Sequence, residues 1–135
     1  ISWGASGTFL SKNAVTVYVR GSRYTKEIMD KFEYFSINVL PEKFKEPLRV
    51  IFGNKSGKDT DKYKEAGMKT VKVDNTMAVE DSTIILICKK ILSGPIDTNT
   101  IIDCENKKNY FNPEDPLDYI NMYIGEVEKI LVKQD

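Results

Sequence analysis

The sequence predicts a mainly β fold, an antiparallel β-barrel with appended helices. Three observations favour it: strand-like segments outnumber helical ones, the connections between them are irregular and unequal, and neither a βαβ repeat nor a glycine-rich dinucleotide fingerprint occurs. The 135 residues, of which 41% are hydrophobic, are enough for one domain with an ordinary core. We therefore expect residues 1–135 to form a single domain.

The first elements are recognised by a change of hydrophobic period. The segment NAVTVYVR (13–20) alternates valines with polar or larger residues, which is the period of a half-buried strand. The next segment (22–35) places Ile28, Phe32 and Phe35 near helical spacing, and Thr25 can cap its first turn. A second strand is expected over 34–42, where Pro41 ends it.

The rest of the chain contains two helical pieces and two long strands. Residues 42–69 are predicted to be helical in two pieces interrupted by the loop 53–59, with Gly67 as a C-terminal cap. The apolar runs at 82–92 and 121–133 predict two further strands. The long connection between them, 93–119, is rich in turn formers, and such a connection is usually functional or covers a sheet edge.

Composition excludes several classes of function. Twenty basic and 20 acidic residues give zero net charge, so no global field favours nucleic acid or an anionic membrane. The chain has no histidine, which removes triad and imidazole-metal chemistry, and no metal site is expected. Cys88 and Cys104 lack metal or redox spacing and are expected to be free thiols, and the sequence shows no membrane span or signal peptide. We expect a cytoplasmic protein without nucleic-acid or membrane partners.

The segment YVRGSRYT (18–25) gathers positive charge and hydroxyl groups where a strand meets a helix. Arg20, Ser22, Arg23 and Thr25 lie where the first free amides of the helix point outward, a combination that can cradle a phosphate. The alternative is structural: Ser22 or Thr25 caps the helix, and both arginines are solvated or paired with acids.

A second polar cluster, GNKSGKDTDK (53–62), has the same character. Its glycine-containing turn can form an anion nest to which Lys55 and Ser56 contribute, and Asp59 is predicted to cap the following helix. The spacing is not that of a P-loop. The alternative is an ordinary solvated lysine loop.

Two single residues are further candidates. Trp3 offers a large ring with an N–H donor, suited either to packing in the core or to contacting a cofactor. Asn38 interrupts the strand FSINVL, and its amide either binds the polar edge of a heteroaromatic ring or satisfies a neighbouring loop.

Four segments in this order, ISWG, TVYVRGSRYTKEIMDKFEYFSINVLPE, FGNKSGKDTDKYKEAG and MYIGEV, resemble the flavin reductase-like, FMN-binding split-barrel family, which includes the flavoredoxins. The resemblance implies a Greek-key split β-barrel that forms a homodimer and holds FMN noncovalently near the dimer interface. It implies that the two polar clusters converge on the FMN phosphate. The implied cofactor-binding residues are Trp3, Arg20, Ser22, Arg23, Thr25, Lys55, Ser56, Gly57, Asp59 and Lys62. Asn38 joins these candidates because of its place in the strand FSINVL, not because of the resemblance.

The sequence also departs from the family pattern. Family members usually have several tens of residues before the ISWG segment, including the first barrel strand, so the fold is expected to lack its first strand or strands. Ile120 stands where related sequences often have a histidine, and Gly21 and Asn13 replace family prolines. No side chain is therefore assigned a catalytic role.

Two functions follow as expectations. The first is an FMN-binding oxidoreductase that transfers hydride or electrons through the flavin, with NAD(P)H as a candidate substrate and a nicotinamide donor or a redox protein as a candidate partner. The alternative is a noncatalytic flavin-binding or interaction module.

Overall fold

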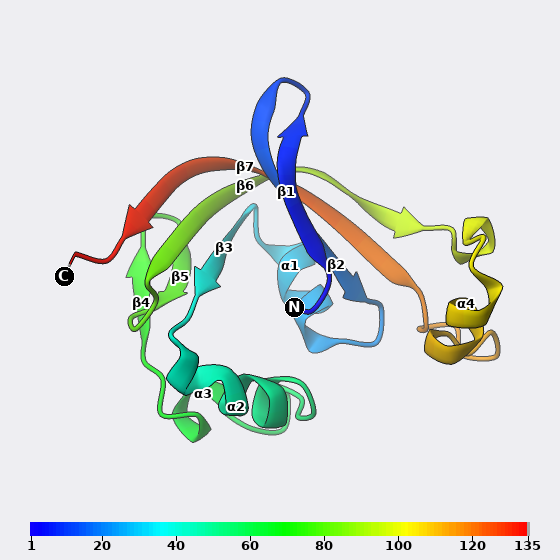
Figure 1. Ribbon diagram of the computed structural model, residues 1–135, viewed down its shortest axis with the longest axis horizontal. Coiled ribbons are helices and arrows are strands. Elements are labelled where there is room, and N and C mark those ends of the chain that lie inside the picture. Colours follow the sequence, from blue (N-terminus) through cyan, green and yellow to red (C-terminus); the bar gives the residue numbers. More distant parts are fainter. Residues whose placement is uncertain (135) are drawn as a thin grey trace.

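The fold is built around a five-stranded antiparallel sheet. The computed structural model describes residues 1–134. In sheet order, the strands are β1 (Gly4–Phe9), β2 (Lys12–Arg20), β7 (Ile120–Val132), β6 (Ile84–Ile96) and β3 (Tyr34–Val39). Strands β6 and β7 are long and strongly curved, and β7 lies at the centre of the sheet (Figure 1). The mainly β antiparallel prediction is confirmed, as are the strands expected near 13–20, 34–42, 82–92 and 121–133.

Three strands were not predicted. Strand β1 forms a hairpin with β2, and its turn places Leu10 and Ser11 at φ values of 48° and 60°. Positive φ at both turn residues suits this kind of hairpin, but Asn and Gly are its usual residues, so the sequence carries no turn signal. Strands β4 (Thr70–Val73) and β5 (Thr76–Val79) form a separate two-stranded ribbon.

Helix α1 (Tyr24–Lys31) is shorter than predicted. The prediction placed Phe35 on the helix, but this residue lies in β3, where it pairs with Cys88 and is buried in the sheet core. Burial on the sheet therefore outweighs the helical spacing. The expected cap by Thr25 is also wrong: the N-cap residue is Arg23, and no side chain within residues 1–134 caps this helix.

The segment between β3 and β4 is helical in two pieces, as predicted. The first piece runs through η1 (Glu42–Phe44), α2 (Lys45–Pro47) and η2 (Leu48–Phe52), and the second is α3 (Lys62–Glu65). Asp61, not Asp59, caps α3, because its carboxylate accepts a hydrogen bond from the Lys64 amide at 3.1 Å. Gly67, with φ of +68°, ends this piece as predicted.

The connection between β6 and β7 contains η3 (Thr98–Thr100) and α4 (Cys104–Tyr110). It forms an arm that projects to one side of the sheet, away from α2 and α3 (Figure 1). Residues 93–96, expected in the irregular connection, instead continue β6.

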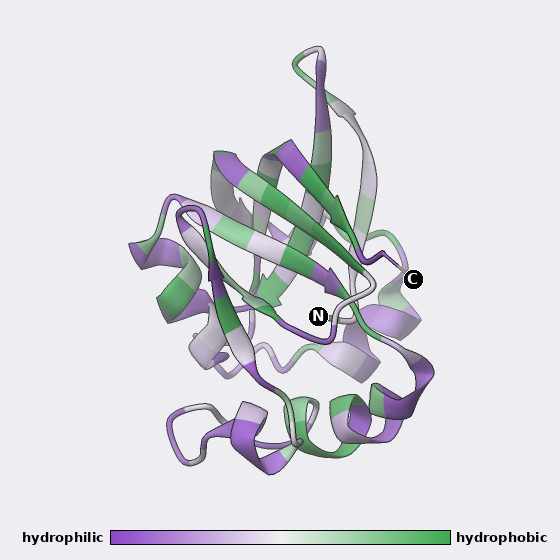
Figure 2. Ribbon diagram, turned by 90° about the vertical axis from the view of Figure 1, so that its left-hand side faces the viewer, coloured by the Kyte–Doolittle hydropathy of each residue, from purple (hydrophilic) through white to green (hydrophobic). Residues whose placement is uncertain are grey.

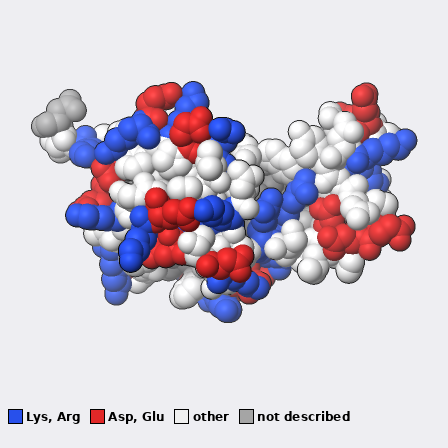
Figure 3. Space-filling model, turned by 90° about the horizontal axis from the view of Figure 1, so that it is seen from below, with Lys and Arg blue, Asp and Glu red and all other residues white. Residues whose placement is uncertain are grey.

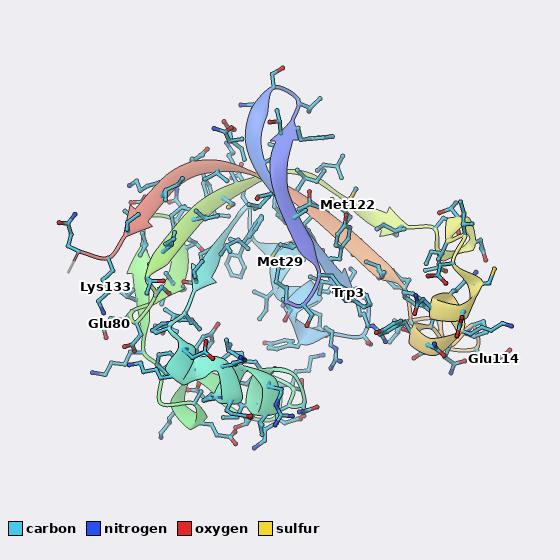
Figure 4. The ribbon with its side chains drawn as sticks, viewed as in Figure 1. Trp3, Met29, Glu80, Glu114, Met122 and Lys133 are labelled. Carbon is cyan, nitrogen blue, oxygen red and sulfur yellow. The ribbon has the colours of Figure 1, made fainter. Side chains whose placement is uncertain are left out.

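Three hydrophobic clusters form the core. The largest lies against α1, and Met29 of this helix packs on it (Figure 4). Its buried members are Val15, Val17, Val19, Phe35, Cys88 and Tyr123. Hydrophobic stretches run along the strands, as Figure 2 shows. The expected alternation of β2 is thus confirmed, and both cysteines are free, with Cys88 buried and Cys104 exposed.

Candidate functional site: two polar loops at the start of helix α1

The two polar clusters singled out in the sequence lie against each other. Gly57 of the loop 53–60 packs on the ring of Tyr24 in α1: a Cβ added at Gly57 would lie 3.1 Å from Tyr24 Cδ1. Lys58 forms an ion pair with Glu27 of α1, and its ammonium lies 5.4 Å from the centre of the Tyr24 ring. The structure therefore brings the loop to the first turn of α1.

Two cations, Arg23 and Lys62, lie near each other at this junction. The Lys62 side chain is partly buried and donates a hydrogen bond to the Phe52 carbonyl at 3.1 Å. Burial lowers the pKa of Lys62, and the neighbouring Arg23 guanidinium lowers it further. Among residues 1–134, no carboxylate forms a salt bridge with either Arg23 or Lys62, although ten such pairs occur elsewhere in this part of the chain. The junction therefore has the charge of an anion site.

The other predicted groups of the loop have partners in the loop itself or in α3. Lys55 forms an ion pair with Glu65 of α3, and this contact lowers the pKa of Glu65. The Ser56 hydroxyl accepts a hydrogen bond from the Lys58 amide at 3.2 Å, and the Ser56 carbonyl accepts one from the Asp59 amide at 3.1 Å. This turn is thus ordered by its own hydrogen bonds.

Ser22 and Thr25 lie on the helix side of the junction, and both are exposed. They flank Arg23, whose extended backbone (φ −85°, ψ 137°) starts α1. The first amides of a helix lack partners within the helix, so hydroxyls, amides and guanidinium are available together at this end.

Arg20 and Trp3 belong to a different cluster. The Arg20 guanidinium donates to the Asp118 carboxylate at 3.3 Å and to the Tyr110 carbonyl at 2.7 Å. It also lies over the rings of Trp3, at 5.7 Å, and Phe111, at 5.4 Å. Trp3, labelled in Figure 4, packs edge-on against Tyr110. The sequence left Arg20 either as part of a phosphate cradle or as a partner of an acid, and its contacts in the structure are those of a residue paired with an acid.

Asn38 uses its amide within the protein. Its Oδ1 accepts hydrogen bonds from the Val79 amide at 2.9 Å and the Ser82 hydroxyl at 3.3 Å, and its Nδ2 donates to the Ser36 hydroxyl at 2.8 Å. It also lines a cleft of about 580 Å³ together with Tyr63 of α3. Asn38 thus ties β3 to the neighbouring β5, as one of the two interpretations expected.

Sequence reasoning missed Glu27, Tyr24, Lys58 and Glu65 as members of this site. Lys58 and its partner Glu27 are 31 positions apart, so no local pattern pairs them. The charge signs alone carry little information, because acidic and basic side chains are intermixed over the surface shown in Figure 3.

Neither a metal-binding cluster nor a membrane-spanning helix occurs among residues 1–134. Over residues 1–134, no group of three or more histidine, cysteine, aspartate or glutamate side chains is arranged to hold a metal ion. Nor does this part of the chain contain a helix that is both long and apolar enough to cross a membrane.

Comparison with known proteins agrees with the fold. Residues 5–135 match the model of the flavin reductase like domain. Two similar solved structures, each with a TM-score of 0.72 over 98% of this chain, are nitrilotriacetate monooxygenase component B from Bacillus cereus (14% identity) and the flavoredoxin of Desulfovibrio vulgaris (16%). A third, a protein with a split barrel domain from Shewanella frigidimarina, has a TM-score of 0.70 and 14% identity over 95% of this chain.

The present chain spans 60% of the first two of these proteins and 56% of the third. A search of curated proteins gave no match. The structural likeness confirms the predicted split-barrel fold.

Proposed function

The chain belongs to the flavin reductase like family, and we propose that it is an FMN-binding oxidoreductase of the flavin reductase or flavoredoxin type. The neighbouring cations Arg23 and Lys62 are the observation that carries this proposal. Their mutual repulsion and the partial burial of Lys62 favour an anion that touches both, and a phosphate monoester has the charge and oxygens to do so.

The chain's own residues divide the binding work. Arg23 presents a planar fork of N–H donors that suits two phosphate oxygens, whereas Lys62 supplies a point charge. Ser22, Thr25 and Ser56 add hydroxyl donors. Lys55 leaves its ion pair with Glu65 and contacts the same anion instead. Bound flavin would supply the redox chemistry, and the protein would supply binding, orientation and electrostatics.

FMN is preferred over FAD in this proposal because its terminal phosphate monoester carries up to about two negative charges on one phosphorus, whereas each phosphate of FAD carries about one. NAD(P)H is the proposed electron donor, and a redox protein is a second candidate partner. A noncatalytic flavin carrier has the same phosphate site, so turnover separates the two functions: oxidation of NAD(P)H in the presence of FMN identifies the enzyme.

We also propose a homodimer. Strands β1 and β3 are the edges of the described sheet, and the end of β7 exposes Ile130 and Val132 at 59% and 63%. Open edges and exposed apolar side chains favour association with a second copy. Light scattering at micromolar concentration tests this, and a strictly monomeric mass would contradict it.

The phosphate site is tested by comparing FMN with riboflavin, which has the same ring system without the phosphate. Flavin fluorescence titrations of wild type and Arg23→Ala should show that the variant loses roughly ten- to a hundredfold in FMN affinity, with little change for riboflavin. Arg49→Ala is the matched control, because Arg49 of η2 is exposed and paired with Glu46 of α2. Equal affinity of the wild type for both flavins would overturn the phosphate site.

A further inference from the structure

We propose that Lys58 is a positioning residue: by docking the loop 53–60 on α1, it sets the spacing between the anion-binding groups of the loop and those of the helix. The proposal rests on the function proposed for this site, and it concerns how the two halves of the site are held at a fixed distance.

Three contacts make the docking. The Lys58 ammonium pairs with Glu27, and its charge lies over the Tyr24 ring, so one side chain engages two residues of α1. Gly57 packs directly on the same ring, where a larger side chain would meet Tyr24 at 3.1 Å. The Ser56 hydroxyl accepts from the Lys58 amide, which couples the docked lysine to a predicted phosphate ligand. The pKa of Lys58 is raised, mainly by its hydrogen bond with Glu27.

The docking opposes a repulsion. Arg23 at the start of α1 and Lys62 beyond the loop carry like charges close enough to shift the pKa of Lys62. This repulsion opposes the approach of the loop to the helix when no anion lies between the two cations. Lys55 does not offset it, because its partner Glu65 lies on the loop side of the junction. The Lys58–Glu27 pair is the described salt bridge that joins the loop to α1.

The variant Glu27→Gln separates docking from bulk electrostatics. It removes a negative charge beside the proposed anion site, so a long-range field alone would tighten FMN binding. Docking predicts the opposite, because the loop loses its anchor on α1. Since both side chains are about half exposed, at 48% and 54%, we expect FMN affinity to fall by roughly two- to fivefold, with riboflavin affinity unchanged.

A charge exchange supplies the rescue. Glu27→Lys and Lys58→Glu should each weaken FMN binding, whereas the double variant Glu27→Lys/Lys58→Glu, which restores an opposite-charge pair, should recover most of the loss. The matched control is the exposed pair Glu42 and Lys45, to which the same changes are made. These control variants should leave the ratio of FMN to riboflavin affinity at the wild-type value.

Hydrogen exchange without flavin gives a readout independent of binding. The amides of residues 58–60 should exchange faster in Glu27→Gln than in wild type or Glu42→Gln. Unchanged exchange, or tighter FMN binding by Glu27→Gln, would overturn the docking role. Faster exchange with unchanged FMN affinity would show that the docking does not position the site. A wild type that does not prefer FMN to riboflavin would instead refute the proposed phosphate site, and the exchange rates would still test the docking.

Discussion

The buried Tyr123 of β7 donates a hydrogen bond from its hydroxyl to the Asp30 carboxylate of α1 at 2.6 Å. Lys26 donates to the other carboxylate oxygen, also at 2.6 Å. Lys90 of β6 lies over the Tyr123 ring and donates to the Met29 carbonyl. This network fixes α1, and with it the proposed anion site, to strands β7 and β6.

Removal of the Tyr123 hydroxyl should destabilise the protein without altering the sheet. Tyr123→Phe keeps the ring but leaves the Asp30 oxygen with one partner fewer, and we expect a loss of about 1–2 kcal/mol in the free energy of unfolding, because Asp30 is partly solvated. Urea denaturation measures this loss. Tyr110→Phe, at an exposed tyrosine, is the control. An equal loss in the free energy of unfolding for this variant would contradict the role of the hydrogen bond.

The ion pair within this network predicts a pH dependence with two limits. The hydrogen bond from Lys26 lowers the pKa of Asp30 below 3.8. The ionised Asp30 carboxylate therefore stabilises the fold above pH 3.8, and this stabilisation is lost as the pH falls through the pKa of Asp30 in the folded protein. Asp30 raises the pKa of Lys26 above 10.5, so that contribution is present below pH 10.5 and is lost as the pH rises further. The stability difference between wild type and Asp30→Asn should therefore be largest between these limits. A difference that does not change with pH would argue against the pair.

Arg20→Ala should loosen the arm between β6 and β7. The guanidinium holds both Asp118 and the Tyr110 carbonyl, so its loss should cost about 1–3 kcal/mol and speed hydrogen exchange in residues 104–119. Because Arg20 is engaged there, the ratio of FMN to riboflavin affinity should stay near the wild-type value. Lys12→Ala, which breaks an exposed pair on the same strand, is the control. A selective loss of FMN affinity in Arg20→Ala would show that the guanidinium binds phosphate instead.

Gly125→Ala should destabilise the core, whereas Gly94→Ala should not. A Cβ at Gly125 would lie 2.6 Å from the Phe35 ring and 3.0 Å from Cys88 Cβ, and a Cβ at Gly94 would meet no atom within 4 Å. Overpacking of this kind costs about 1–3 kcal/mol. Thermal unfolding of both variants measures the difference, and similar melting temperatures would contradict the close packing at Gly125.

The two thiols should differ in reactivity. Burial raises the pKa of Cys88 to about 12, which keeps it protonated at neutral pH, while Cys104 is exposed at the start of α4. Alkylation of the native protein should label Cys104 alone, and alkylation after unfolding should label both. Mass spectrometry gives the count, and rapid native labelling of Cys88 would contradict its burial.

Elements with a strong internal period could be predicted from sequence, and those defined by a partner could not. Strand β2 alternates valines from Val15 to Val19, and β6 and β7 are long and rich in β-branched residues, so all three were located. Apart from Phe9, strand β1 consists of small, exposed residues, and it is a strand because β2 pairs with it. Phe35 fitted both the helical period of 22–35 and the strand predicted over 34–42. It lies in the strand because it is buried beside Cys88.

The candidate site was predicted in part for the same reason. The two loops were recognisable by composition, and the contact of Gly57 with Tyr24 places them together. The partners of each charge were not predictable, because Arg20 pairs with Asp118, 98 positions later. Long side chains at a strand end can turn toward either neighbour, and the arm that captures Arg20 has no periodic signal of its own.

The central place of β7 in the sheet has a consequence for synthesis on the ribosome. Strand β7 follows β2 and β6 in the chain and pairs with both, with Ala14 of β2 opposite Glu126. The earlier strands emerge before β7, which lies between them in the sheet. Until then the hairpin of β1 and β2 and the pair of β3 and β6 are not joined, and both have exposed edges. We expect such nascent chains to be bound by chaperones and cleaved readily by proteases until residue 132 has left the exit tunnel, after which the pieces join into one sheet.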